Sequence, residues 1–355
     1  MSANSSSKFW NSVHLLRAVA AIMVVIHHIP QYLVGRIPNV ISFENGAAGV
    51  DIFFAISGFV MYGTALQPNA SWRKFLISRA SRIIPLYWTC TLILGLSAIF
   101  LPSLFKTFST DWSVIFRSIL FLPNYNNEGQ IRPLLQMGWT LHYEVFFYLT
   151  TGLILYLTRF NAALMASAWL AILSVALSLA SVQIEFTPLI LLAPITIEFL
   201  LGALIAYVAL NFEPLRSPRL SVTCLSITLL LAGAYLIMSQ SPTGISWARF
   251  SYWGIGGALI LFGSLLLETR ISQNFFSFIR GRFFGDISYA LYLTHGFSLS
   301  LGFKLSKILS IQSFYLIGAV MLSVSIILAG ITHHLLEKRL NEKFKALLAS
   351  VLHQK

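Results

Sequence analysis

The chain contains ten stretches of about 20 mostly apolar residues, separated by short segments that carry most of its charges. A bilayer core about 30 Å thick is crossed by roughly 20 apolar residues of α-helix. The runs are continuously apolar and lack the alternation of lipid-facing strands, so a transmembrane barrel is disfavoured. The sequence therefore predicts an all-α, polytopic transmembrane helical bundle. Its predicted spans are residues 13–34, 47–66, 83–104, 139–158, 162–181, 188–209, 220–239, 249–267, 286–303 and 312–335.

Composition supports this fold class and excludes several functions. Only 10% of the 355 residues are charged, against about a quarter in soluble domains. The net charge of +12 is not concentrated in a basic block, so we expect no nucleic-acid partner. Cys90 and Cys224 both lie in apolar runs, which argues against a disulfide framework or a cysteine-ligated zinc site. We expect one integral-membrane domain over residues 1–355, without a fused extracytoplasmic domain.

The distribution of basic residues predicts the orientation of the bundle. With ten spans and both termini in the cytoplasm, 17 of the 24 Lys and Arg residues fall on the cytoplasmic side and 7 on the outer side. Positive charge is enriched in cytoplasmic loops of membrane proteins. Both termini are therefore predicted to be cytoplasmic, with membrane lipids surrounding the spans.

Arg17 and His28 are two polar residues on one face of the first predicted span. Eleven residues at about 100° each bring them within roughly 20° of one another, about 16 Å apart along the axis. Ionisable residues inside apolar spans are functional candidates by default. A second interpretation stays open, in which Arg17 is a positive-inside anchor and His28 a packing residue.

Two carboxylates are predicted near the depth of His28. Asp51 and Glu144 each lie about five residues into a span that descends from the outer side. A carboxylate beside an imidazole would hold its tautomer and raise its basicity. For Asp51 the alternative is an acid favoured by the N-terminal end of a helix dipole. His142, close to Glu144 in the chain, is a weaker candidate that could face an aqueous vestibule.

Arg79 and Arg82 are predicted at the cytoplasmic end of the third span. Their i,i+3 spacing places both guanidinium groups on one helix face, where they could bind phosphate oxygens. Attraction to anionic lipid is the alternative. His295 is predicted mid-membrane as a buried, hydrogen-bonded histidine, and Glu198, similarly deep, receives no role from its local sequence. The predicted polarity, arginines at the inner mouth and acids with His28 in the outer half, fits an anionic donor inside and an acceptor outside.

These motifs, in order along almost the whole chain, resemble those of the acyltransferase family 3 membrane proteins, which acylate bacterial surface sugars. In length the chain is similar to the stand-alone exopolysaccharide O-acetyltransferases of that family. The matching motifs are Arg17-(ten residues)-His28, Gly49-Val50-Asp51-Ile52-Phe53-Phe54, Arg79-x-x-Arg82, Trp139-Thr140-Leu141-x-x-Glu144, Phe199-x-x-Gly202 and Gly285-x-x-Ser288-Tyr289-x-Leu291-Tyr292-Leu293-x-His295.

The resemblance implies a reaction and roles for individual residues. Acetyl-CoA, or another short acyl-CoA, would be the cytoplasmic co-substrate. The acceptor would be a hydroxyl of an exopolysaccharide, an O-antigen or a lipid-linked repeat unit. No permanently bound cofactor, no metal and a location in the bacterial inner membrane are implied. The implied roles are CoA binding by Arg17, Arg79, Arg82, Ser288 and Tyr289, general-base catalysis by His28 oriented by Asp51 or Glu144, and sugar binding by Trp139 and His142.

Two other functions remain compatible with the sequence. A transporter or flippase of lipid-linked saccharides would line its passage with the same polar residues, although the two halves show no matched repeat of the kind common in transporters. A non-catalytic scaffold of a polysaccharide synthase complex would leave the ordered motifs unexplained. The sequence makes no prediction of oligomeric state.

Overall fold

A computed structural model describes residues 10–67, 70–101, 111–122, 124, 133–158, 161–179, 193–212, 219–268, 270–271, 275 and 281–353. Every secondary-structure element in these ranges is helical, which confirms the predicted all-α class. The long helices are α1 (Asn11–Leu33), α2 (Gly49–Ala65), α3 (Trp72–Phe100), α5 (Trp139–Leu157), α6 (Ala162–Leu179), α7 (Ile197–Asn211), α8 (Leu220–Ser239), α10 (Ile255–Glu268), α12 (Gly281–Ile308), α13 (Phe314–Thr332) and α14 (Lys338–His353). The short ones are η1 (Glu44–Ala48), α4 (Trp112–Ile119), η3 (Gln136–Gly138), η5 (Pro194–Thr196), α9 (Trp247–Arg249), η7 (Phe250–Gly254) and η8 (His333–Glu337).

Seven helical stretches in the described ranges are long and apolar enough to cross a membrane. The remaining three predicted spans coincide with α5, α6 and α12. The predicted spans 162–181 and 188–209 each include some residues of 180–192, which lie outside the described ranges. The chain is therefore an integral membrane protein, while the count of ten and the cytoplasmic location of its termini stay predictions.

Helix α3 begins at Trp72 and not at residue 83, where the span was predicted to start. Ser71 caps the helix, because its side chain accepts a hydrogen bond from the Lys74 backbone N–H. Lysine and arginine are good helix formers, so the charges that ended the apolar run do not interrupt the helix. As a result Arg79 lies about 10 Å inside α3, well beyond the helix end.

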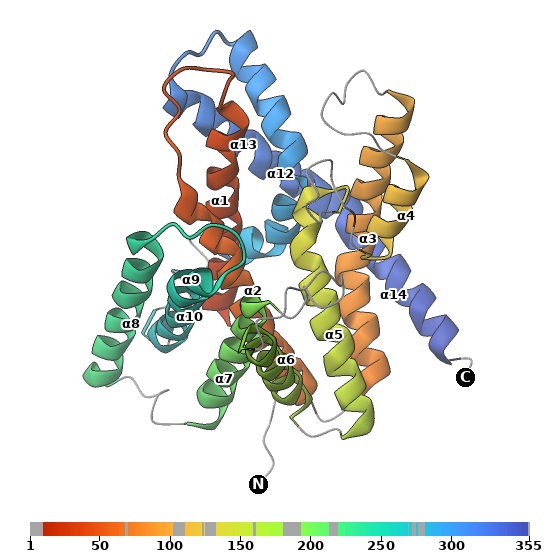
Figure 1. The fold of residues 1–355 in the computed structure, drawn as a ribbon, viewed down its shortest axis with the longest axis vertical. Coiled ribbons are helices and arrows are strands. Elements are labelled where there is room, and N and C mark those ends of the chain that lie inside the picture. Colours follow the sequence, from red (N-terminus) through yellow and green to blue (C-terminus); the bar gives the residue numbers. More distant parts are fainter. Residues whose placement is uncertain are drawn as a thin grey trace.

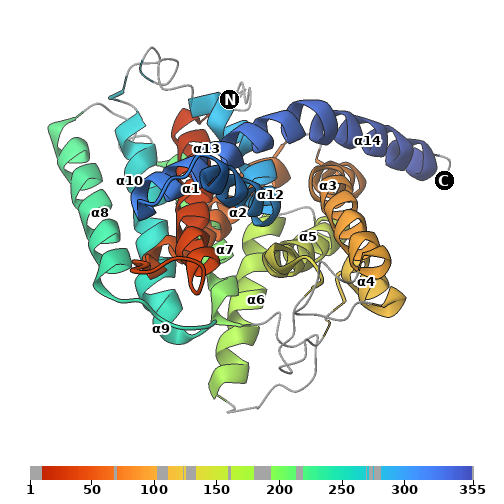
Figure 2. The ribbon, with the colours of Figure 1, turned by 90° about the horizontal axis from the view of Figure 1, so that it is seen from above.

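The last helix is also longer than predicted. The helical stretch that begins at Phe314 continues to His353, past the predicted end at residue 335. It passes through the π-helical turn η8, where the side chains of His333 and Glu337 lie 2.8 Å apart. Its final part, α14, packs against α3 through the rings of Trp88 and Phe344, whose centroids are 5.8 Å apart. Figure 2 shows α14 reaching across to α3 at the edge of the bundle.

Helices α1, α2 and α12 occupy the middle of the bundle (Figures 1 and 2). On one side lie α3, α4 and α5, and on the other α8 and α10. Helices α1 and α12 pack together and run in the same direction, since Arg17 contacts Ser288 and, further along both helices, His28 contacts His295. This central pair positions the polar residues of the site.

Helices α2 and α7 approach each other through two glycines. A Cβ atom on Gly58 would lie 2.1 Å from the Phe199 carbonyl oxygen, and one on Gly202 would lie 1.9 Å from that of Ala55. Small residues at such crossings let helix backbones pack closely in a membrane. The contact holds α7, with Glu198 near its start, against the motif-bearing helix α2.

Candidate active site

A basic cavity of about 680 Å³, its open mouth included, lies between α1, α2, α3, α5 and α12. Three arginines from two helices line it: Arg17 of α1, and Arg79 and Arg82 of α3. The i,i+3 spacing does place the last two on a common face. One carboxylate, Glu144 of α5, lines the same cavity. With Glu144 ionised, the cavity still carries an excess of positive charge that suits an anionic ligand.

Arg79 has hydrogen-bonding capacity that none of the described residues satisfies. Its Nε and Nη1 atoms are buried without a partner, and its Nη2 donates to Ser78 Oγ at 3.2 Å. Among the described residues, no ion pair within 4.0 Å joins Glu144 to an arginine of the cavity. Leaving a buried charged donor unpaired is costly, so these atoms mark the cavity as a candidate binding site.

Arg17 is oriented by the beginning of α12. Its Nε and Nη2 atoms both donate to Ser288 Oγ at 3.3 Å, and that hydroxyl in turn donates to the Gly285 carbonyl at 2.6 Å. Two of the residues to which the resemblance gives a CoA-binding role, Arg17 and Ser288, are thus in direct contact. The pair brings the N-terminal part of α1 to the cavity wall.

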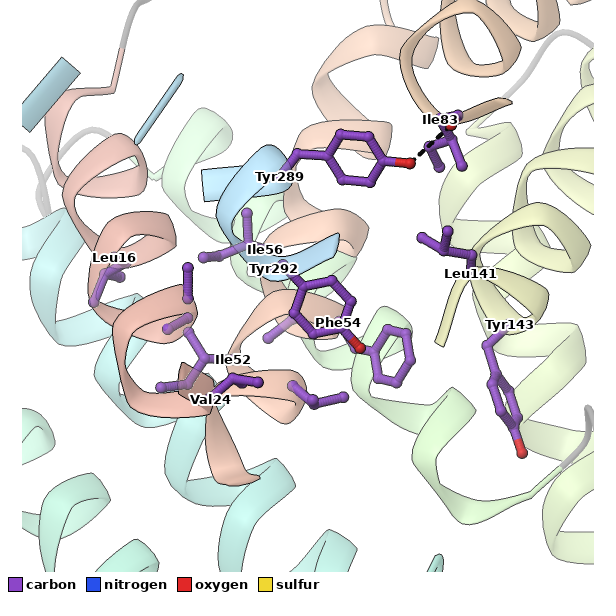
Figure 3. Packing of buried hydrophobic residues seen from close by; sticks show 14 of the residues in the cluster. Leu16, Val24, Ile52, Phe54, Ile56, Ile83, Leu141, Tyr143, Tyr289 and Tyr292 are labelled. Atoms are coloured by element: carbon purple, nitrogen blue, oxygen red, sulfur yellow. Dashed lines mark hydrogen bonds between the residues drawn. The ribbon is translucent and has the colours of Figure 1, made fainter. Parts of the chain in front are cut away.

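Two tyrosines of α12 point into the middle of the bundle (Figure 3). Tyr289 donates to the Ile83 carbonyl of α3 at 2.7 Å and lines the cavity. Tyr292 lines it as well, and its hydroxyl group lies 2.9 Å from Thr140 Oγ1 and donates to the Met137 carbonyl at 3.1 Å. These bonds tie α12 to α3 and to the start of α5.

Glu144 is held in the arginine cavity by two hydrogen bonds. Its Oε1 accepts a hydrogen bond from Ser57 Oγ at 2.6 Å, and its Oε2 accepts one from the Tyr148 hydroxyl at 3.2 Å. The sequence predicted Glu144 in the outer half beside His28, apart from the arginines. That prediction is wrong, because Glu144 shares the cavity with all three of them.

The register of α5 against α3 explains the error. A Cβ atom on Gly138 would lie 2.5 Å from the Tyr87 ring, halfway along α3, and one on Gly152 would lie 2.9 Å from Leu76. The two helices are thus antiparallel, and α5 begins level with the middle of α3. Glu144 falls between these two contacts and comes level with the arginines, a displacement that apolar run lengths do not reveal.

His28 of α1 is oriented by its own helix. Its Nδ1 lies 2.8 Å from the Val24 carbonyl oxygen. Because a carbonyl oxygen can only accept, Nδ1 carries the hydrogen and Nε2 presents a lone pair, the form that a general base requires. The predicted orientation of His28 by Asp51 or Glu144 is wrong: a backbone carbonyl holds this tautomer.

Asp51 faces away from α1. A Cβ atom on Gly49 would lie 2.3 Å from the Ala20 carbonyl, so that face of α2 touches α1. Asp51 follows two residues later, about 200° around the helix. It is 0% exposed and forms a bidentate ion pair with Arg249, whose Nε and Nη2 atoms donate at 3.0 and 2.8 Å.

Arg249, at the start of a predicted span, is 7% exposed and lies within this second charged cluster. Its guanidinium carbon is 4.9 Å from the ring centre of Trp253 and 5.9 Å from that of Trp139. Glu198 interacts with Asp51 and Arg249, although neither of its carboxylate oxygens has a hydrogen-bond partner. Trp139 is half-buried beside this cluster and is not among the residues that line the arginine cavity.

His142 lies away from the site. It is 8% exposed, its Nδ1 donates to the Gly138 carbonyl at 2.9 Å, and its ring centroid is 5.6 Å from that of Phe121. The predicted aqueous vestibule at His142 is wrong, because the side chain packs inside the protein. Within the described ranges, no three His, Cys, Asp or Glu side chains are grouped so that they could hold a metal ion.

Four polar residues of the cavity, Ser57, Thr140, Tyr148 and Tyr292, are absent from the predicted site. Helical spacing could have found two of them. Tyr148 follows Glu144 by four residues and Tyr292 follows Ser288 by four, which places each on the same helix face as a predicted residue.

Comparisons with known proteins agree with this arrangement of motifs. The profile of the acyltransferase 3 family, described as an acyltransferase domain, matches residues 10–331. The chain is 30% identical over 303 residues to the exopolysaccharide production protein ExoZ of Rhizobium meliloti strain 1021, covering 84% of this chain and 90% of that protein. It is 27% identical over 160 residues to the peptidoglycan O-acetyltransferase OatA of Listeria monocytogenes, covering 41% of this chain and 24% of that protein. No solved structure matches.

Proposed function

The chain belongs to the acyltransferase 3 family, and we propose that it transfers an acetyl or other short acyl group from acyl-CoA to a sugar hydroxyl. Its family and its apolar helices make it an integral membrane acyltransferase. The proposed acceptor is an exopolysaccharide, an O-antigen or a lipid-linked repeat unit at the bacterial cytoplasmic membrane. The names of both relatives, one of exopolysaccharide production and one of peptidoglycan O-acetylation, support this acceptor class.

The observation that supports an acyl-CoA site is the cavity in which Arg79 has unused hydrogen-bond donors. Arg17, Arg79 and Arg82 offer guanidinium groups to one space, and two buried donors of Arg79 lack a partner. Guanidinium groups bind phosphate oxygens in bidentate fashion, and CoA carries three phosphates. We propose that the arginines bind these phosphates from the cytoplasmic side.

The acyl-bearing arm of the donor would then extend along α12. The carboxylate of Glu144 is proposed to accept hydrogen bonds from the amide N–H groups of that arm, with Tyr289 lining its path. Trp139 is proposed to stack on the sugar ring. The ion pair of Asp51 with Arg249 holds α2 beside Trp139. We propose that it thereby positions Trp139 for the sugar.

His28 is the proposed general base. Its Nε2 lone pair takes the proton of the sugar hydroxyl as that oxygen attacks the thioester carbonyl carbon. The carbon–oxygen bond forms, the carbon–sulfur bond breaks, and the proton passes from His28 to the departing thiolate. A positioned base of this kind typically contributes about 10²–10⁴-fold in rate.

Donor binding can be tested with detergent-purified protein titrated with acetyl-CoA. We expect Arg79→Ala to raise the Kd about 10- to 100-fold, the effect of losing a charge-assisted hydrogen bond. Arg117→Ala, at an exposed arginine of α4, is the matched control and should leave the Kd unchanged. Equal Kd values for Arg79→Ala and the wild type would reject the donor site.

Acceptor chemistry can be tested by NMR of surface polysaccharide from cells that carry His28→Ala in place of the native gene. Loss of O-acetyl signals from a polymer that is still exported is the expected result. A fully acetylated polymer would reject His28 as the base. Arrest of export would instead favour a transporter of lipid-linked saccharides.

A further inference from the structure

We propose that His295 is the positioning residue for His28: it accepts a hydrogen bond from the His28 imidazole once that ring is protonated during acyl transfer. The inference rests on the proposed function, in which His28 is the general base. Local sequence gives His295 no more than a packing role, and its spatial relation to His28 supplies the reason to assign it another.

Helix α12 connects the basic cavity with the pair His28 and His295. Ser288 contacts Arg17, Tyr292 lies about 6 Å further along the helix axis, and His295 another 4.5 Å beyond that. The three residues fall within about 60° of each other around the helix, so they share one face. Tyr292 lines the cavity, and its ring centroid is 6.1 Å from that of His295. His295 therefore lies next to a residue of the cavity wall.

The two imidazoles are in contact and have the same tautomer. Their ring centroids are 4.8 Å apart. His295 Nδ1 lies 2.6 Å from the Tyr292 carbonyl, just as His28 Nδ1 bonds the Val24 carbonyl. Since both Nδ1 atoms must carry hydrogen, both Nε2 atoms present lone pairs. No hydrogen bond joins the rings, as expected for two acceptors without a proton between them.

Among the described residues, none donates a hydrogen bond to His295 Nε2. The side chain is 0% exposed, and its Nε2 is buried without any partner. An unsatisfied buried acceptor in a well-packed interior calls for an explanation. A proton on His28 Nε2 would supply the missing donor, with a small rotation of either ring.

Other groups near His28 cannot serve in this way. His27, whose ring centroid is 5.0 Å from that of His28, has both nitrogens engaged, Nδ1 with the Phe43 carbonyl at 3.0 Å and Nε2 with Gln31 at 2.8 Å. Asp51 is paired with Arg249, and Glu144 lies in the arginine cavity. Among the described residues, this leaves His295 as the contacting side chain with a free acceptor.

The step balances without a further reactant. As the sugar oxygen bonds to the acyl carbon, its proton moves to His28 Nε2. The His28 ring, now an imidazolium, then turns so that its Nε2–H donates to His295 Nε2 while the tetrahedral intermediate exists. When the carbon–sulfur bond breaks, the ring turns back, the same proton passes to the thiolate, and His28 returns to neutral. His295 exchanges no atoms with either substrate. Its contribution is a hydrogen bond that exists only while His28 is charged, and it therefore stabilises the charged intermediate of acyl transfer.

Three substitutions separate this role from packing. His295→Asn keeps a donor for the Tyr292 carbonyl and removes the acceptor at the Nε2 position. His295→Gln places an amide oxygen near that position, and His295→Phe fills the volume without a polar atom. The assay is thiol release from acetyl-CoA by purified protein, with de-acetylated polysaccharide from the same cells as acceptor.

We expect kcat to fall about 10- to 100-fold in His295→Asn and in His295→Phe, with the KM for acetyl-CoA within about twofold of wild type. His295→Gln should recover part of the loss. A packing role predicts the opposite order, with the Phe variant active, and that order would overturn the inference. If the Asn variant does not fold, the comparison of Gln with Phe decides alone.

A double variant distinguishes this inference from the function beneath it. If His295 acts through His28, then His28→Ala combined with His295→Asn should be no slower than His28→Ala alone. Additive losses would overturn the inference. Full activity of His28→Ala would instead reject the proposed base, whatever the behaviour of His295.

Discussion

Replacing Arg249 with methionine tests the second charged cluster. Asp51 is 0% exposed and receives hydrogen bonds of 3.0 and 2.8 Å from Arg249, which is itself 7% exposed. Removing one partner leaves a carboxylate buried without compensation, which typically costs about 3–5 kcal/mol. We expect Arg249→Met to lose about that much free energy of unfolding, since methionine replaces the volume but none of the charge.

The measurement is denaturant-induced unfolding of the protein in detergent micelles. Arg36→Met is the matched control, because Arg36 is exposed, and its loss should stay within about 0.5 kcal/mol. Adding Asp51→Asn to Arg249→Met should restore part of the loss, since it removes the uncompensated charge. A cost below about 1 kcal/mol for Arg249→Met, or strictly additive losses in the double variant, would contradict a buried, mutually dependent pair.

Two further substitutions have calculable effects. Tyr292→Leu removes the ring at the end of the cavity and should raise the ratio of kcat/KM for butyryl-CoA to that for acetyl-CoA about tenfold, as measured by thiol release. Tyr62→Leu, at a buried tyrosine that does not line the cavity, should leave that ratio unchanged. Gly202→Ala places a Cβ atom 1.9 Å from the Ala55 carbonyl and should cost about 1–3 kcal/mol of unfolding free energy. Gly296→Ala, which meets no atom within 4 Å, should not destabilise the protein, and an equal loss at both glycines would refute the close approach.

The helices of this chain are readable from the sequence because a span needs a minimum apolar length. Predicted and observed limits agree to within two residues for α1, α2, α5 and α8. They disagree at α3, where hydropathy ends at the charges while the helix continues through them from Trp72. Run length reports where a chain can meet lipid, and helix limits depend in addition on capping and on contacts with neighbouring helices.

Pairs of site residues were predictable where a single helix fixes them. The 3.6-residue period places Arg79 with Arg82, and both do line one cavity. Relations between helices were not predictable, because they depend on which face of a helix meets its neighbour. The face of α2 that carries Gly49 meets α1, and this turns Asp51 toward Arg249 and away from His28.

The same limit applies to depth. Glu144 and His28 were assigned similar depths by counting residues from the outer ends of their spans. Counting assumes that every helix starts at the same level, whereas Gly138, just ahead of α5, packs against Tyr87 in the middle of α3. The offset carries Glu144 inward to the arginines, and His28 is left with the imidazole of His295 as its neighbour.

The two charged clusters of this bundle differ in a way that assigns their roles. In the cluster around Asp51, Arg249 donates to Asp51 and to the Ala47 carbonyl, so its guanidinium group has partners within the protein. In the arginine cavity, Arg79 forms no ion pair with Glu144, and two of its buried donors have no partner among the described residues. Desolvating a guanidinium group without a partner is unfavourable, and a fold that needed Arg79 only for stability would have supplied one. The arginine cavity is therefore the candidate binding site, and the cluster around Asp51 holds helices beside it.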